Sequence, residues 1–378
     1  MILLKGKYNN NYQSFKHLLI VTNKEGTIKM GKKIFLITWY FPSFHGGAEK
    51  SIMEELKDYK KKGYNVFVIC FDEKYPMGKF NIEDISGINY GLKFKLPQEF
   101  RLYSLLLNKN YIYSKITDHI KELKDSIILT QSLIAPIVAE FCVKNKIKYI
   151  YYLRDEINLN EFHNYEVGIR KILKTIKTII EYSAIWYYKS KNIFALKNAY
   201  KIISNSKFMH DLLQKKYGLD SEIIYPKINF SELDKKLIKK ENQIYITFIG
   251  GNNAMKGADI VLKIAKKMPN EKFLIVGPYN RKYKKGNITY MPYQRDVMEI
   301  YKISKLILMP SRWNEAFGRI VLEANYLGIP VITSNKGGLP EANKNKELIV
   351  DDLENIDVWI DKINYILNKN ENDRYGKK

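Results

Sequence analysis

The chain has 378 residues, enough for two α/β domains and more than one ordinary core requires. Its composition, with 46% hydrophobic and 27% charged residues, is that of a globular protein and excludes a disordered chain. The 63 basic and 40 acidic residues give a net charge of +23, which favours anionic partners such as nucleotide phosphates or an acidic membrane surface. The basic residues are scattered, without an arginine-rich block, an RNP-type strand or zinc-finger spacing, so no nucleic-acid partner is expected.

The rarer residue types narrow the class of protein further. The two cysteines lie in apolar segments, which favours a reducing compartment over a disulfide framework. The five histidines lack ligand spacing, so we expect no metal site. No apolar run approaches the roughly 20 residues of a membrane-spanning helix. We therefore expect a cytoplasmic protein.

Regular alternation of apolar strands and amphipathic helices begins after residue 30. Residues 1–29 are irregular, and two interpretations are open: a small N-terminal extension, or a start upstream of the native one at Met30, which we favour. The strands expected in a first domain, residues 30–225, are 34–40, 65–71, 127–131, 147–153 and 201–205. The expected helices lie near 47–62, 104–123, 135–145 and 168–198. Short apolar strands between helices are typical of a parallel sheet covered on both faces.

The pattern breaks around residues 219–243 and then resumes as a second domain, residues 226–354. Its expected strands are 244–250, 272–277, 287–291, 305–310 and 329–333. A last helix, within residues 355–378, either stays on this domain or crosses back to the first. The predicted fold is therefore α/β, with two Rossmann-like, doubly wound parallel-sheet domains facing a central cleft. In such folds ligands bind at the carboxyl ends of the strands.

The segment 310–324 is the most informative one for function. It follows a buried strand and enters a helix expected to begin near residue 316, so Glu315 lies in the loop and Glu323 about two turns into the helix. The two carboxylates are then about 10 Å apart along the helix axis. That separation suits the two ends of an extended polyol ligand, with the first free amides of the helix facing an anion or hydroxyl between them. The alternative is a pair of exposed glutamates, but the apolar neighbours of Glu323 indicate burial and a need for partners.

This segment resembles the Glu-x7-Glu signature of the family-4 retaining glycosyltransferases of the GT-B fold (glycosyl transferases group 1). The resemblance extends from residue 30 to the end of the chain, and residues 328–341 are similar to the family's second glycine-rich segment. It implies a metal-independent enzyme that moves a sugar, with retention of anomeric configuration, from a nucleotide diphosphate sugar to a glycan or lipid-linked acceptor. Synthesis of cell-surface polysaccharide or glycoconjugate is the implied role. The resemblance assigns the donor sugar hydroxyls to Glu315 and the nucleotide ribose to Glu323.

A second glycine-rich turn joins a strand to a helix at Gly250 and Gly251, and Lys256 follows at the start of that helix. Glycines there let the backbone approach a phosphate, and the lysine adds a positive charge. Taken alone, such a segment is more often an ordinary strand-to-helix turn. Members of the family carry an arginine where this chain has Gly251. Lys256 is then the main expected ligand of the diphosphate, with Arg312 or Arg319 as helpers.

The first domain offers weaker candidates at the ends of its strands. Gly46 and Gly47 form a strand-to-helix turn that resembles the family's N-terminal glycine loop, which lies over the donor. The Arg154–Asp155 pair follows a strand, and it is either a structural salt bridge or part of the acceptor side of the cleft. The acceptor-side candidates are His45, Gln131, Arg154 and Asp155.

The resulting hypothesis is a transferase without cofactor or metal, in which Glu315 and Lys256 are the catalytic residues. The expected donor-binding residues are Gly46, Gly47, Gly250, Gly251, Lys256, Glu315, Ala316, Phe317, Gly318 and Glu323. Three alternatives remain open: a nucleotide-sugar epimerase of the GT-B fold, a non-catalytic protein that binds a sugar nucleotide and, as the weakest, a basic nucleic-acid-binding protein.

Residues 163–201 contain eight basic residues and two glutamates. Isoleucines and a leucine recur there at helical spacing, and Trp186-Tyr187-Tyr188 follows. One interpretation is a helix packed on its own domain with a solvated basic face. The other is an interfacial helix on an anionic membrane surface, which would place the protein peripherally at the inner face of the cell membrane.

Overall fold

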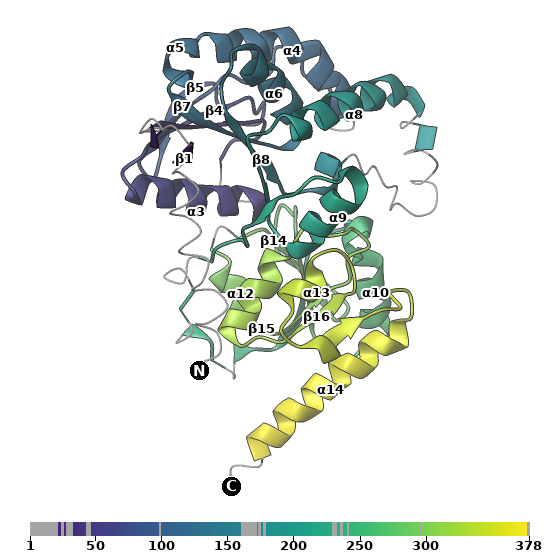
Figure 1. Ribbon diagram of the computed structural model, residues 1–378. Helices are drawn as coiled ribbons and strands as arrows, with labels where there is room; N and C mark the ends of the chain where they lie inside the picture. Colours follow the sequence, from purple (N-terminus) through teal and green to yellow (C-terminus); the bar gives the residue numbers. More distant parts are fainter. Residues whose placement is uncertain are drawn as a thin grey trace. The chain divides into compact units, whose positions relative to one another are not determined.

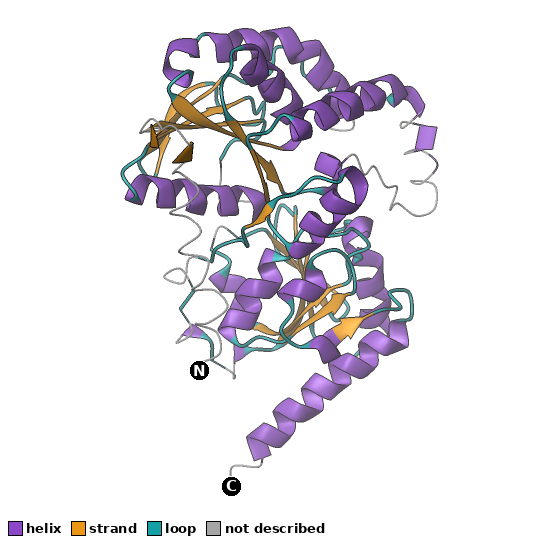
Figure 2. Ribbon diagram, viewed as in Figure 1, coloured by secondary structure: helices purple, strands orange, loops and turns teal. Residues whose placement is uncertain are grey.

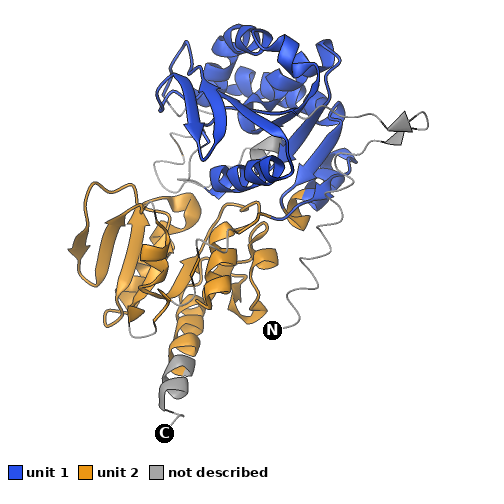
Figure 3. Cartoon of the chain, turned by 90° about the vertical axis from the view of Figure 1, so that its left-hand side faces the viewer, with its two compact units in different colours: residues 1–161, 180–205, 210–225 blue, residues 162–179, 206–209, 226–378 orange. Residues whose placement is uncertain are grey.

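The computed structural model describes residues 22–23, 26–27, 33–42, 47–97, 100–159, 172, 175–176, 179–228, 233–234, 237–239, 242–294 and 296–375 (Figure 1). The chain divides into two compact units (Figure 3). Residues 1–161, 180–205 and 210–225 form the first unit, and residues 162–179, 206–209 and 226–378 form the second. The last change of unit falls between residues 225 and 226, where the sequence pattern places the domain boundary.

The first unit is built on an eight-stranded sheet with the order β10-β9-β8-β7-β3-β4-β6-β5. Its strands are β3 (Lys33–Thr38), β4 (Asn65–Cys70), β5 (Gly78–Ile82), β6 (Ile85–Asn89), β7 (Ser126–Gln131), β8 (Tyr149–Leu153), β9 (Lys201–Ser204) and β10 (Glu222–Ile223). Neighbouring strands are parallel, except that the edge strand β5 runs antiparallel to β6. The β5–β6 hairpin is absent from the sequence prediction, because its half-exposed residues lack the continuous apolar run that marks a buried strand.

Helices cover both faces of this sheet (Figure 2). They are α3 (Gly47–Lys61), α4 (Arg101–Thr117), α5 (Ile120–Leu123), α6 (Ala135–Lys144), α8 (Tyr182–Lys197) and α9 (Lys207–Tyr217), with short 3-10 turns η2 (Ser132–Ile134) and η3 (Glu156–Leu159). Ile52, Met53 and Leu56 of α3 pack on Ile34 and Leu36 of β3. The alternate residues of β3 face the opposite side, where α6 contacts β3, β7 and β8. The helix predicted over 104–123 is two helices, α4 and α5.

The second unit contains a seven-stranded sheet with the order β13-β14-β12-β11-β15-β16-β17. Its strands are β11 (Tyr245–Ile249), β12 (Phe273–Gly277), β13 (Tyr283–Lys285), β14 (Ile288–Pro292), β15 (Ser304–Met309), β16 (Val331–Ser334) and β17 (Ile349–Val350). Neighbours are parallel except β13, which runs antiparallel to β14. Two α/β units with mainly parallel sheets confirm the fold class predicted from the alternation of strands and helices.

The helices of the second unit also pack apolar residues against their sheet. They are α10 (Ala258–Lys267), α11 (Met298–Tyr301), α12 (Arg319–Leu327), α13 (Leu339–Ala342) and α14 (Ile356–Tyr375), with 3-10 turns η6 (Ala254–Lys256) and η7 (Lys346–Leu348). The start of α14 belongs to the core of this unit, because Trp359 and Ile363 are fully buried with the apolar residues of α10, β11 and β15. Trp359 also donates its ring N–H to the carbonyl of Leu353 at 3.1 Å.

Within residues 1–29 the structure describes one antiparallel pair of two-residue strands, β1 (Thr22–Asn23) and β2 (Gly26–Thr27). The interpretation of Met30 as the native start stays a prediction. Across the described ranges, no helix combines the length and the apolar character needed to cross a bilayer.

Candidate active site

Three loops of the second unit meet at the carboxyl end of its sheet. They follow the adjacent strands β11, β15 and β16. The carbonyl of Met255, in the first loop, accepts the backbone N–H groups of Arg312 at 2.8 Å and Trp313 at 3.2 Å, in the second. The N–H of Gly338, in the third loop, donates to the carbonyl of Glu315 at 2.7 Å. The backbone therefore joins the two donor-binding segments predicted in this unit, which contain Lys256 and Glu315, to the glycine-rich segment 328–341.

Lys256 and Glu315 meet where these loops join. Asn253 caps η6, since its side chain accepts the N–H of Met255 at 2.9 Å, and Lys256 ends that turn. The Lys256 ammonium lies 3.5 Å from Oε1 of Glu315. The Glu315 charge raises the pKa of Lys256, against the opposing effect of burial. Oε1 of Glu315 is buried and has no hydrogen-bond partner among the described residues, so it retains capacity to accept a ligand hydroxyl.

Glu323 is buried on α12 and has the partners that its apolar surroundings require. Arg319 donates Nε to its Oε1 at 2.6 Å, and the buried Tyr301 donates its hydroxyl to Oε2 at 2.7 Å. Each carboxylate oxygen can accept a second hydrogen bond. The helix begins at Arg319, not at Ala316 as expected, because Gly318 has φ +105° and lies outside helical geometry. Ala316 and Phe317 consequently belong to the loop.

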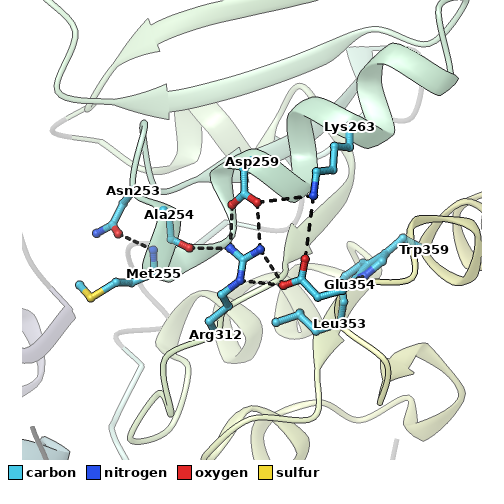
Figure 4. Close-up of polar contacts among 9 residues, drawn as sticks. All are labelled: Asn253, Ala254, Met255, Asp259, Lys263, Arg312, Leu353, Glu354 and Trp359. Carbon is cyan, nitrogen blue, oxygen red and sulfur yellow. Dashed lines mark hydrogen bonds and ion pairs between the residues drawn. The ribbon is translucent and has the colours of Figure 1, made fainter. Parts of the chain in front are cut away.

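Arg312 holds this end of the sheet together (Figure 4). Its guanidinium donates to both carboxylate oxygens of Asp259, at 2.7 and 2.9 Å, and to the carbonyl of Ala254 at 2.8 Å. Nε of Arg312 also donates to Glu354 at 2.8 Å. Burial raises the pKa of Asp259, but the bonds and charge of Arg312 outweigh it and lower the pKa overall. Arg312 therefore pairs with Asp259, and Arg319 pairs with Glu323. Of the three cations expected to bind the diphosphate, Lys256 is the one that lies beside Glu315.

The backbone explains why an arginine does not fit at Gly251. Gly251 has φ +60°, and a Cβ added there would lie 2.7 Å from Cδ of Pro278 and 3.3 Å from Cα of Gly277. The N–H groups of Gly250 and Gly251 both donate to the carbonyl of Val276, at 3.0 and 2.9 Å. The loop after β11 therefore packs directly on the end of β12, and a side chain would force the two apart.

A shallow hollow of about 490 Å³ lies beside this turn, lined by residues 278–281 and Tyr283. Tyr279 connects the hollow to the turn, because its hydroxyl donates to the side chain of Asn252 at 3.0 Å. Tyr279, Tyr283 and Tyr290 form an aromatic group, in which Tyr283 stacks on Tyr290 with centroids 4.7 Å apart.

Comparison with known proteins gives a family match in the second unit and a similar fold over most of the chain. Residues 229–378 match the family described as Glycosyl transferases group 1. The chain is 25% identical over 347 residues to an uncharacterized 42.6 kDa protein in the cps region of Klebsiella pneumoniae, covering 86% of this chain and 91% of that protein. Its fold is similar to sucrose-phosphate synthase from Thermosynechococcus elongatus, with a TM-score of 0.67, 14% identity, and 89% and 90% of the two chains covered. It is also similar to Anabaena Alr3699/HepE in complex with UDP-glucose, with a TM-score of 0.65, 15% identity and 90% of both chains covered.

The second unit carries a glycosyl transferases group 1 domain, and the chain has the GT-B fold. The family match falls on the unit that holds Lys256, Glu315 and Glu323. The first unit lies outside that match, so its candidate residues rest on their own geometry.

The first unit places some of its candidates at the carboxyl edge of its sheet. Gly47 is the first residue of α3, whereas His45 and Gly46 lie outside the described residues. Gln131 ends β7 and is buried. Arg154 follows β8 and donates Nη2 to Oε1 of Glu55 on α3 at 2.5 Å, which makes it a buried salt bridge.

Sequence reasoning missed a group of ionisable side chains at the same edge. Arg101 donates to the hydroxyl of Tyr40 at 2.9 Å, and Asp72 accepts the N–H of Phe41 at 2.9 Å. Burial, and secondarily the charge of Asp72, raises the pKa of Glu49 in the first turn of α3. The sequence pattern could have indicated both carboxylates. Asp72 lies two residues after a buried strand, and Glu49 lies two residues after a glycine pair.

Proposed function

We propose that this glycosyltransferase moves a sugar from a nucleotide diphosphate sugar to a hydroxyl of a glycan or lipid-linked acceptor, with retention of configuration and without a metal ion. The observation that carries the proposal is the Lys256–Glu315 pair, in which a buried carboxylate oxygen lacks a hydrogen-bond partner among the described residues. The Alr3699/HepE structure, similar in fold, contains UDP-glucose, which supports a nucleotide sugar as the donor.

On the donor side, Glu315 binds hydroxyls of the transferred sugar and Glu323 binds the ribose. Lys256 neutralises the charge that develops on the diphosphate as its bond to the anomeric carbon breaks. The acceptor hydroxyl forms the new bond to that carbon and gives its proton to the departing diphosphate. A fixed cation acts most strongly when it is in place before the charge appears. The ion pair with Glu315 and the Asn253 cap hold Lys256 in this way.

On the acceptor side, the proposal rests on unpartnered polar atoms at the carboxyl edge of the first sheet. Buried atoms without a hydrogen-bond partner in the described structure include Oγ1 of Thr38, Oε1 of Gln131, Oγ of Ser132, Nε of Arg154 and Oδ1 of Asn205. These residues end or follow four adjacent strands, β3, β7, β8 and β9. Buried polar groups are normally satisfied, and hydroxyls of a sugar both donate and accept. A polyol acceptor suits this mixed set.

The backbone at this edge supports the same assignment. Ser132 has φ +60°, a left-handed conformation that costs a non-glycine residue about 1–2 kcal/mol. Such strain is concentrated at functional sites. Gln131 and Ser132 are therefore favoured over Arg154, which already pairs with Glu55, as the residues that contact the acceptor.

The relative in the cps region supports a role in cell-surface polysaccharide synthesis. Thermal denaturation in the presence of UDP-, GDP- and ADP-sugars tests the donor, because a ligand at 100 times its Kd adds about 2.7 kcal/mol of stability. Product analysis with the stabilising donor, by NMR of the anomeric proton, then tests transfer and retention. Conversion of the donor sugar without an acceptor identifies an epimerase, and donor binding without turnover identifies a non-catalytic protein; either result overturns the proposal.

A further inference from the structure

Helix α8 of the first unit exposes aromatic side chains that its own packing does not use. Tyr182 is 68% and Trp186 65% exposed, and Ile180, just before the helix, is 56% exposed. Ile172, Ile176 and Ile179, which precede Ile180 in the sequence, are exposed as well. A tryptophan on a rigid helix surface normally buries most of its ring, so this exposure indicates a contact that the isolated chain lacks.

The opposite side of α8 is firmly attached to the unit. Asn192 accepts the hydroxyl of Tyr151 at 2.7 Å, and the carbonyl of Ala195 accepts that of Tyr149. Tyr103 of α4 donates to the carbonyl of Ile180 at 2.8 Å. Helix α8 packs along α6 and α4 (Figure 1). The exposed aromatic residues are therefore held on a fixed helix.

The net positive charge of this helix favours an anionic partner. Residues 182–197 contain three lysines and no acidic residue, and the preceding Glu181 is buried. Lys189 and Lys197 are exposed, and they follow Tyr182 and Trp186 at helical spacing. Tryptophan and tyrosine prefer the headgroup level of a bilayer, and lysines beside them interact with anionic lipid.

We propose that the exposed face of α8, made of Ile180, Tyr182, Trp186, Lys189 and Lys197, docks on an anionic lipid bilayer. Trp186 and Tyr182 enter the headgroup region and the two lysines contact anionic headgroups. This surface shares no residue with the donor site at Lys256, Glu315 and Glu323, so membrane docking and donor binding can be tested with different variants.

Of the four tryptophans, Trp186 is exposed, Trp313 is half-buried in the second unit, and Trp39 and Trp359 are buried. A spectral shift that is lost in Trp186→Ser therefore reports on docking. We expect the fluorescence of the full chain to shift to the blue when vesicles of equal parts phosphatidylglycerol and phosphatidylcholine are added at low salt. The chain should co-sediment with these vesicles and dissociate as salt screens the charges. Absence of both the shift and the sedimentation overturns the proposal.

Two double variants separate the apolar and the charged contributions. The double variant Tyr182→Ser/Trp186→Ser should reduce the partition coefficient of the protein between water and vesicles about tenfold or more. Lys189→Gln with Lys197→Gln should reduce it about fivefold for each lysine, on anionic vesicles only. Tyr365→Ser, which changes a half-exposed tyrosine of α14 in the second unit, is the matched control and should bind as wild type does.

Two further measurements exclude other causes. All variants should keep the thermal stabilisation by donor, so a loss confined to vesicle binding supports docking even if the proposed transfer reaction is wrong. Sedimentation velocity without lipid tests a second copy as the occupant. A wild-type dimer that Trp186→Ser converts to monomer, or double variants that bind vesicles as tightly as wild type, would overturn the proposal.

Discussion

The ammonium of Lys256 lies 3.5 Å from Oε1 of Glu315, although the two residues belong to loops that follow different strands. The contact depends on the carbonyl of Met255, which binds the backbone of Arg312 and Trp313 and so joins the loops. A fixed cation beside a carboxylate with spare hydrogen-bonding capacity is suited to a ligand that carries both phosphate and hydroxyl groups.

The two glutamates should separate the binding of nucleotide from that of sugar. Glu323→Gln should weaken both the free nucleoside diphosphate and the full donor, since a hydrogen bond to a charged group contributes about 1.5–3 kcal/mol, or roughly 10- to 150-fold. Glu315→Gln should lower turnover far more than it weakens nucleoside diphosphate binding, because Glu315 contacts the sugar directly but affects the diphosphate only by holding Lys256 in place. Calorimetric titration of both variants with nucleotide and donor measures the difference. Equal weakening of free nucleotide by both substitutions contradicts the assigned roles.

An added side chain should destabilise the protein more at Gly251 than at Gly286. The two glycines have the same backbone conformation, but only Gly251 has atoms close to the position of a Cβ. Gly286 has φ +61° and nothing within 4 Å of an added Cβ, so Gly286→Ala should cost only the left-handed backbone, about 1–2 kcal/mol. Gly251→Ala should cost more and should also weaken donor binding, because its Cβ meets Pro278 at 2.7 Å. Urea denaturation of the two variants gives the comparison. A smaller loss for Gly251→Ala would show that the loops separate easily.

Substitution of Arg312 should lower the stability of the fold. It should also lower activity indirectly, because Arg312 helps to position the turn that carries Lys256. Arg312→Met leaves the Asp259 carboxylate and the carbonyl of Ala254 without their donor, and we expect a loss of about 1–3 kcal/mol together with weaker donor binding. The control is Lys305→Met, which breaks the partly exposed pair with Glu271 and should cost less than about 1 kcal/mol. Equal melting temperatures for Arg312→Met and wild type would contradict the structural role proposed for Arg312.

Glu49 should give the folded state a defined pH dependence. Its folded pKa is raised above the ordinary value of 4.5, so the folded chain binds this proton more tightly than the unfolded chain. The contribution of Glu49 to stability is therefore present below pH 4.5 and is lost as the pH rises through the folded pKa. Glu49→Gln should gain melting temperature relative to wild type between pH 4 and pH 7. A constant difference between the two proteins across that range is the contrary result.

Transfer should not depend on a divalent ion. Because Lys256 and backbone amides are the proposed ligands of the diphosphate, EDTA should leave most of the activity intact. Activity that disappears in EDTA and returns with Mg²⁺ or Mn²⁺ would refute the mechanism. The measurement requires the donor identified by thermal denaturation.

The sequence alone determined the two α/β units, because strand and helix periodicity is a local property that each segment carries in its apolar spacing. It also predicted Glu315 and Glu323 from one continuous motif and Lys256 from another, and the structure brings Lys256 to Glu315. It misplaced the start of α12 by three residues, because a left-handed Gly318 ends the loop without changing the apolar pattern. It also missed the β5–β6 hairpin, whose residues lack that pattern.

Only the tertiary structure decided the partners of the charged side chains. Arg154 pairs with Glu55, 99 positions earlier, and Arg312 pairs with Asp259, 53 positions earlier. No local pattern encodes such pairs, because they depend on which strands are neighbours in the sheet. The same holds for Gly251, where contact with Gly277 and Pro278 on the adjacent strand leaves no room for a side chain. Local spacing thus predicted candidate site residues, and the strand order decided which charged side chains pair with one another.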